Sequence, residues 1–98
     1  MAYWIYMMGS SNGNALYTGV TNYLYRRVTE HKLQQVKGFT KLYNCVNLLY
    51  YEKYQNIKEA ISREKEIKGW TRDKKEDLIR KLNPERNDLL PELSQTDI

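Results

Sequence analysis

The first twenty residues contain two apolar segments separated by turn-forming residues. The segment from Met1 to Met8 is almost unbroken apolar and aromatic, which is typical of a buried strand. Residues 9–14 supply the glycines and short polar side chains that a hairpin connection requires, and residues 15–20 predict the returning strand. The pattern therefore predicts an antiparallel hairpin at the start of the chain.

Helical periodicity follows the hairpin. Residues 23–36 predict a helix preceded by residues that can cap it. Leu24, Val28 and His31 fall at i, i+4 and i+7, so they share one face of this helix. Beyond it, residues 39–44 are expected to be irregular.

The second half of the chain predicts one more strand and two more helices. Residues 45–52 are rich in strand-forming side chains. Asn56 can cap a helix over residues 57–69, and Thr71 can cap a third helix. The inward faces of these two helices are expected to hold Ile57, Ala60, Ile61, Glu64, Ile67 or Lys68, Leu78, Ile79 and Leu82.

The order β-β-α-β-α-α defines the expected fold class. It predicts an α/β domain of the α+β type, with a small, three-stranded, mainly antiparallel sheet flanked by helices. We expect this domain to span residues 1–82. Residues 83–98 carry two prolines and mostly polar or acidic side chains, so they predict a loosely packed, mobile, acidic tail.

Composition narrows the cellular setting. The 98 residues contain a single cysteine and a single histidine, which excludes a disulfide framework and a multi-cysteine zinc site. No apolar run approaches the roughly 20 residues that a membrane span needs, and the start shows no signal-peptide pattern. We therefore expect a cytoplasmic protein with no membrane association.

Charge is unevenly distributed along the chain. Residues 1–82 hold 15 Lys and Arg against 8 Asp and Glu, a net charge of +7, whereas residues 83–98 have a net charge of −3. A basic body suggests a polyanionic partner, most simply nucleic acid. A lysine-rich surface without such a partner would give the same count.

Several polar residues fit a plain core poorly. Glu64 lies within the apolar stripe of its helix, where a carboxylate needs a cation: a lysine, an arginine or a metal ion. Arg27 and His31 share a face with apolar residues, and an arginine placed there can hold a phosphate through two parallel hydrogen bonds. Tyr6 and Tyr17 lie near the centres of the paired hairpin strands, so their side chains are expected to approach one another.

These residues resemble a known family. Trp4-Ile5-Tyr6 followed after ten residues by Tyr17-Thr18-Gly19 is similar to the paired signature of the GIY-YIG nuclease superfamily. Trp4 stands where the signature has glycine, and Thr18 where it has isoleucine. The likeness continues through Arg27, His31 and the segment ending at Glu64, and spans about residues 3–83. It is greatest to small stand-alone members related to the N-terminal nuclease domain of the excision-repair subunit UvrC.

The resemblance implies a metal-dependent DNA endonuclease that acts in DNA repair or recombination. Glu64 would hold one divalent ion, Mg²⁺ or Mn²⁺, and Arg27 would neutralise charge on the phosphoryl oxygens. Either Tyr6 or Tyr17 would orient or deprotonate the attacking water, and His31 would help relay the proton.

Other features of the resemblance concern substrate contacts and selectivity. Lys41 or the metal would lower the pKa of the catalytic tyrosine, and Lys41 and Tyr43 are expected to contact the substrate. The family's late asparagine matches Asn83 or Asn87, of which Asn83 is preferred. A domain this small has little surface for reading sequence, so we expect an accessory protein to supply selectivity. The alternative is a non-catalytic nucleic-acid-binding module that keeps the GIY-YIG fold.

Overall fold

The computed structural model describes residues 1–93 and contains one antiparallel sheet of three strands. The strands are β1 (Tyr3–Ser10), β2 (Leu16–Thr21) and β3 (Cys45–Tyr54), in the order β2-β1-β3. Both pairings of β1 are antiparallel. The predicted hairpin, the third strand and the α+β class are thus confirmed.

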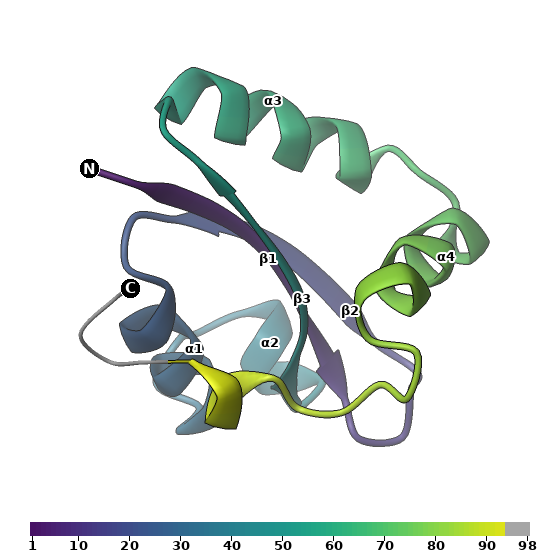
Figure 1. The fold of residues 1–98 in the computed structure, drawn as a ribbon. Helices are drawn as coiled ribbons and strands as arrows, with labels where there is room; N and C mark the ends of the chain where they lie inside the picture. Colours follow the sequence, from purple (N-terminus) through teal and green to yellow (C-terminus); the bar gives the residue numbers. More distant parts are fainter. Residues whose placement is uncertain (94–98) are drawn as a thin grey trace.

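Helices cover both faces of the sheet (Figure 1). One side carries α1 (Leu24–Lys32), the short α2 (Phe39–Leu42) and a single 3-10 turn over Leu90–Glu92. The other side carries α3 (Ile57–Lys68) and α4 (Arg72–Leu82). None of the helices within residues 1–93 is long and apolar enough to cross a membrane.

Strand β1 is the centre of two separate cores. Trp4, Tyr6 and Met8 point to the α1 side, and Ile5 and Met7 point to the side of α3 and α4. Successive side chains of a strand point to opposite faces, so a central strand covered on both sides must be apolar at every position. This explains why the N-terminal segment shows no apolar–polar alternation.

The predicted caps of α3 and α4 are present, but α1 begins after Tyr23 without the expected side-chain cap. Several helix faces also differ from expectation. The Asn56 side chain accepts hydrogen bonds from the backbone N–H groups of Lys58 and Glu59, at 2.8 and 3.4 Å, and the Thr71 side chain accepts one from Lys74. Helix α1 ends at Lys32, earlier than predicted. On the expected inward faces of α3 and α4, three apolar residues are exposed: Ile57, Ile61 and Leu82.

Two segments expected to be irregular or loose are ordered. Residues 39–42 form α2, because Thr40 on this turn is buried against α1 and bonds to His31. The expectation of a loosely packed tail is wrong for residues 83–93, since Leu89 enters the core on the α1 side. Asp88 pairs with Lys32 and accepts a hydrogen bond from the backbone N–H of Leu48 at 3.0 Å. Residues 94–98 lie outside the described part of the chain.

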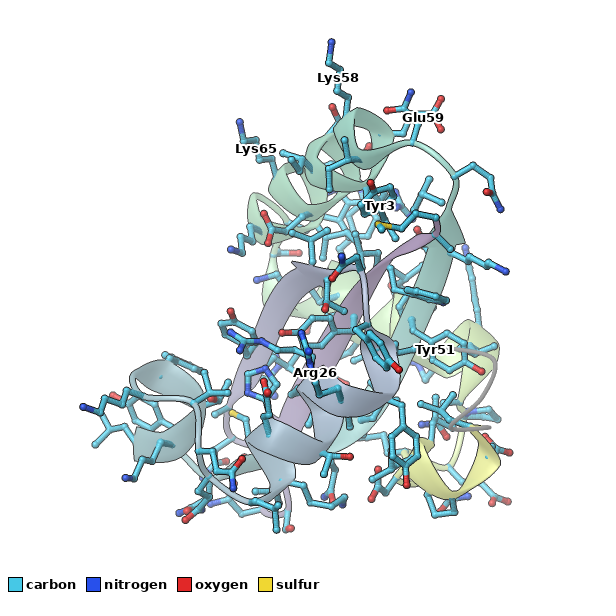
Figure 2. The ribbon with its side chains drawn as sticks, turned by 90° about the vertical axis from the view of Figure 1, so that its left-hand side faces the viewer. Tyr3, Arg26, Tyr51, Lys58, Glu59 and Lys65 are labelled. Carbon is cyan, nitrogen blue, oxygen red and sulfur yellow. The ribbon has the colours of Figure 1, made fainter. Side chains whose placement is uncertain are left out.

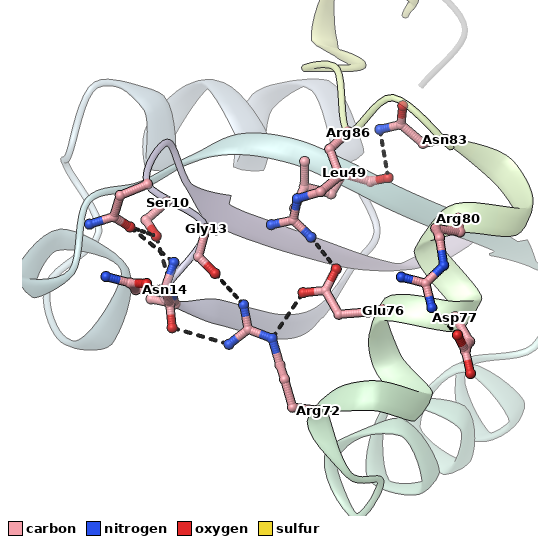
Figure 3. Close-up of polar contacts among 12 residues, drawn as sticks. Ser10, Gly13, Asn14, Leu49, Arg72, Glu76, Asp77, Arg80, Asn83 and Arg86 are labelled. Carbon is pink, nitrogen blue, oxygen red and sulfur yellow. Dashed lines mark hydrogen bonds and ion pairs between the residues drawn. The ribbon is translucent and has the colours of Figure 1, made fainter.

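Arg72 ties the start of α4 to the tip of the hairpin (Figure 3). Its guanidinium donates to the backbone carbonyls of Gly13 and Asn14 and also pairs with Glu76, which in turn pairs with Arg86. The hairpin, α4 and residue 86 are therefore joined by one polar network.

Candidate active site

A buried hydrogen-bond chain links β1, α1 and α2. The Tyr6 hydroxyl lies 2.8 Å from His31 Nε2, and His31 Nδ1 lies 3.0 Å from Thr40 Oγ1. Tyr6 and His31 are each only 1% exposed, and Thr40 is 3% exposed. Because both ring nitrogens have a partner, the orientation of the imidazole is held from two sides.

Burial determines the protonation states of the residues in this hydrogen-bond chain. It raises the pKa of Tyr6 far above its ordinary value, a shift that the neighbouring Tyr17 increases and Arg27 partly offsets. Burial, together with the positive charge of Arg27, lowers the pKa of His31 to about 4. At neutral pH the site therefore contains a protonated phenol hydrogen-bonded to an uncharged imidazole.

Arg27 brings a permanent positive charge to the edge of this chain. Its guanidinium faces the Tyr6 hydroxyl and forms an ion pair with Glu30 at 3.2 Å. Burial alone lowers the pKa of Arg27, but the neighbouring Tyr6 hydroxyl and the hydrogen-bonded Glu30 raise it above its usual value. Its side chain is 38% exposed, so it remains accessible to an anion. The adjacent Arg26 instead extends into solvent beside Tyr23 (Figure 2).

Gly19 makes the room in which the Tyr6 hydroxyl lies. The two residues are directly paired across β1 and β2. A Cβ atom at Gly19 would lie 2.6 Å from the Tyr6 hydroxyl oxygen and 2.9 Å from Cε2 of Tyr17. Such distances are shorter than any van der Waals contact. The third residue of the Tyr17-Thr18-Gly19 motif is therefore required by close packing against the two tyrosines.

Tyr17 extends the cluster toward α3. Its ring centroid lies 6.2 Å from that of Tyr6 and 5.4 Å from that of His31, which confirms the expected approach of the two tyrosines. The ammonium of Lys68 lies 6.0 Å from the Tyr17 ring centroid and 3.5 Å from the Glu64 carboxylate. Lys68 thus connects the carboxylate of α3 with the aromatic cluster.

Glu64 has the cation that its position requires. Its side chain is 16% exposed and its partner in the structure is Lys68, one of the alternatives that the sequence left open. Within residues 1–93, no group of three or more His, Cys, Asp or Glu side chains is placed to hold a metal ion. Any ion at Glu64 would therefore have at most two such side chains among the described residues and would keep several waters, which suits a hard ion such as Mg²⁺.

Two of the three residues expected to contact the substrate, Lys41 and Tyr43, lie near the aromatic cluster. Tyr43 packs on Phe39 with ring centroids 4.7 Å apart, and Phe39 in turn stacks on Tyr17. Lys41 lies on the same short helix, beside an exposed hollow that Phe39 and Tyr43 also line. These two expected residues therefore lie at the outer side of the aromatic cluster.

Asn83 does not belong to the site, which corrects the prediction that it contacts the substrate. It is 4% exposed, and its amide nitrogen donates to the backbone carbonyl of Leu49 (Figure 3). The same nitrogen donates to the backbone carbonyl of Asn87. Its side-chain oxygen accepts from the Asn87 backbone N–H at 3.0 Å. With its amide satisfied by the backbone, Asn83 holds the chain beyond α4 against β3.

Sequence reasoning missed Phe39 and Thr40 as residues around the site, and it did not identify Lys68 as the partner of Glu64. For Thr40 and Phe39 there was no helical periodicity to notice, because α2 is a single turn. Lys68 carried a usable signal, since it follows Glu64 by four residues and such pairs meet on a helix face.

The arrangement combines a neutral proton acceptor, two phenols and an accessible guanidinium on an antiparallel sheet. A sequence model of the GIY-YIG catalytic domain matches residues 2–77, and the chain belongs to this family of nucleases.

The individual relatives are small proteins of similar length. The UPF0213 protein of Staphylococcus aureus strain Mu3 is 39% identical over 79 residues, which is 81% of this chain and 95% of the relative. The same values hold for the UPF0213 protein of strain N315. The solution structure of a UPF0213 protein from Bacillus halodurans superposes with a TM-score of 0.57 at 26% identity, covering 87% of this chain and 89% of that one.

Proposed function

We propose that this protein is a divalent-metal-dependent endonuclease that hydrolyses phosphodiester bonds in DNA. The observation that carries the proposal is the chain Tyr6–His31–Thr40 with the Arg27 guanidinium at its edge. Membership of the GIY-YIG family supports it. The hydrogen-bond chain Tyr6–His31–Thr40 offers a route for a proton, and the Arg27 guanidinium offers a partner for a phosphate.

Arg27 is the group proposed to bind the reacting phosphate. Its fork of N–H donors matches two phosphate oxygens, and its charge stabilises the additional negative charge of the transition state. Glu30 keeps the guanidinium in place from the opposite side. Removal of one such donor typically lowers the rate by about 100- to 1000-fold.

The attacking water needs a group that orients it and accepts its proton. One of the two phenols, Tyr6 or Tyr17, is proposed to orient the water. The hydrogen bond from Tyr6 to His31 lets a proton move on to a neutral imidazole, and Thr40 fixes the orientation of that imidazole. Burial keeps His31 uncharged at neutral pH, so its ring nitrogen is free to take part in this hydrogen bond.

Glu64 is the residue proposed to hold the divalent ion, Mg²⁺ or Mn²⁺. When bound, such an ion polarises the scissile phosphate and stabilises the leaving oxygen. The carboxylate is partly buried and lies next to Lys68, which itself lies near Tyr17. The ammonium of Lys68 already balances the charge of Glu64, so binding of the ion would require this ion pair to loosen.

DNA is the proposed substrate because the body of the protein is basic. Lys58 and Lys65 project from α3 into solvent and would add sequence-independent attraction to a polyanion (Figure 2). A role in DNA repair or recombination within the cytoplasm, with an accessory protein supplying selectivity, completes the proposal.

A cleavage assay with matched variants tests the proposal. Purified protein is incubated with DNA and Mg²⁺ or Mn²⁺, and the wild type should produce nicked or cut product that EDTA abolishes. Arg27→Ala should lose activity by at least about 100-fold, whereas Arg26→Ala, its exposed neighbour, should retain it. Glu64→Gln should abolish metal-dependent cleavage, and Glu59→Gln on the exposed side of the same helix should not.

The same assay separates the roles of the tyrosines and the alternative function. Tyr6→Phe and Tyr17→Phe each keep the ring and remove one hydroxyl, so the larger loss of rate identifies the phenol that orients the water. Equal cleavage by the wild type and by Arg27→Ala and Glu64→Gln would indicate a contaminant and refute the proposal. Salt-sensitive DNA binding without cleavage under any divalent ion would identify a non-catalytic binding module.

A further inference from the structure

A row of aromatic rings leads from the buried hydrogen-bond chain to the protein surface. The Tyr17 ring lies 5.4 Å from His31, the Phe39 ring stacks on Tyr17 at 6.4 Å with an interplanar angle of 28°, and Tyr43 lies 4.7 Å from Phe39. The row begins in the candidate active site and ends at α2. Whatever contacts its outer end is therefore adjacent to the reacting groups.

The outer two rings are unusually exposed for aromatic side chains. Phe39 is 45% exposed and Tyr43 is 51% exposed. They are four residues apart and lie on the same outward side of α2, while Thr40 points inward to His31. The hydrogen bond of Thr40 thus fixes the position of the two rings relative to the site.

Basic residues surround these two rings. Two hollows share Phe39 and Tyr43 in their walls, and the charged residues that line them are Lys37, Lys41, Arg72 and Lys75. The residues lining these two hollows include no Asp or Glu. Arg72 is occupied by the hairpin carbonyls and Glu76, so the lysines are the groups available to a ligand. Flat apolar rings with lysines beside them fit a nucleobase attached to a phosphate.

We propose that Phe39 and Tyr43 form a stacking platform for an unpaired nucleobase, so that the preferred substrate is DNA with a single-stranded segment at the cleavage site. This inference rests on the proposed nuclease function, because it names the substrate class of the same site. In a duplex each base is covered on both faces by its neighbours, so an external aromatic ring cannot stack on it. A base that has left the stack offers a free face to the rings.

Binding measurements without metal test the platform independently of cleavage. In EDTA, fluorescence anisotropy gives the Kd of a fluorescein-labelled single strand and of the duplex of the same sequence. Phe39→Ala and Tyr43→Ala should each weaken binding of the single strand by about 5- to 100-fold, the effect of losing one base–aromatic stack, and change duplex binding little. Tyr23→Ala removes a similarly exposed tyrosine beside Arg26 and should change neither.

Two further substitutions distinguish stacking from general packing. Phe39→Leu keeps an apolar side chain without a ring and should behave like the alanine variant, whereas Phe39→Trp should restore binding. A single strand containing 2-aminopurine should lose fluorescence on binding to the wild type and not to Phe39→Leu. Circular dichroism checks that each variant is folded, which the exposure of both rings leads us to expect.

The outcomes separate the platform from the nuclease proposal. Equal losses for single strand and duplex, unchanged binding in Phe39→Ala and Tyr43→Ala, or no binding of the single strand by the wild type would each overturn the platform. Ring-dependent binding of single strands without cleavage under any divalent ion would refute the nuclease while leaving the platform intact.

Discussion

Substitution of Gly19 by alanine is the most direct perturbation of the site geometry. Alanine fits the backbone at this position, which lies outside the left-handed region, so the cost is steric alone. The added methyl would lie 2.6 Å from the Tyr6 hydroxyl oxygen and 2.7 Å from Cζ of the same ring. Tyr6 is buried and bonded to His31, so its ring has little freedom to move away.

The size of the effect follows from three contributions. Overpacking of a well-filled core costs about 1–3 kcal/mol. Weakening of the hydrogen bond between Tyr6 and His31 adds about 1 kcal/mol. Alanine in place of glycine lowers the entropy of the unfolded chain, which offsets about 0.5 kcal/mol of this cost. We therefore expect a loss of about 1.5–3.5 kcal/mol, which lowers Tm by about 6–28 °C for a domain of this size.

Thermal unfolding and DNA cleavage measure the two consequences of Gly19→Ala. A Tyr6 hydroxyl displaced by about 1 Å should lower the cleavage rate about 100-fold at a temperature where the variant is still folded. Gly69→Ala is the matched control, because its added methyl would lie 3.5 Å from the nearest atom at an ordinary helical φ. The control should be neutral or slightly stabilising. A Tm for Gly19→Ala equal to that of the control would refute the packing described for Tyr6.

Three further predictions concern protonation and packing. His31 is the protein's only histidine, and burial lowers its pKa to about 4. An NMR titration of its ring protons should therefore show a midpoint near 4. A midpoint near 6.5 would contradict the burial of the Tyr6–His31–Thr40 hydrogen-bond chain. Because the unfolded histidine binds a proton first, the free energy of unfolding should also fall as the pH drops from about 6.5 to about 4. Burial alone raises the pKa of Glu52, but hydrogen bonds from Arg63 hold it below its usual value. Glu52→Gln should therefore cost about 2 kcal/mol in urea unfolding at neutral pH, and this cost should shrink as the pH falls through the lowered pKa of Glu52. A cost that stays the same as the pH falls would show that the charge is irrelevant. Leu89→Ala should lower the free energy of unfolding by about 2–4 kcal/mol because Leu89 lies in the core. Leu82→Ala, at an exposed position, should lower it little. Equal small losses for both variants would mean that residues 83–93 do not pack as described.

The sequence predicted the elements well where the signals are local. The apolar run over residues 1–8, the caps Asn56 and Thr71 and the buried face of α1 all depend on neighbours a few residues away. Such signals failed for residues 83–93. Leu89, Leu90 and Leu93 pack against the core without helical or strand periodicity, and the backbone partner of Leu89 is Leu48 in β3, far away along the chain.

The candidate site was only partly accessible to the same reasoning. Tyr6 and Tyr17 were expected to meet because a hairpin pairs the strands that carry them, and this is what the structure shows. Arg27 and His31 were noticed on one helix face, but their contact with Tyr6 could not be derived from helix spacing. Asn83 was assigned to the site by resemblance, whereas its amide is satisfied by the backbone.

The sequence by itself therefore determined the class of fold, the order of its elements and the types of residue available for chemistry. These follow from hydrophobic periodicity and capping, which act over a few residues. Only the tertiary structure decided which side chains meet. The bond between Tyr6 and His31 spans 25 residues and depends on the face of β1 that carries Tyr6, and a shift of register by one residue would turn that side chain to the opposite face. The positions of Gly19, Thr40 and Lys68 around the tyrosines depend in the same way on how strands and helices pack.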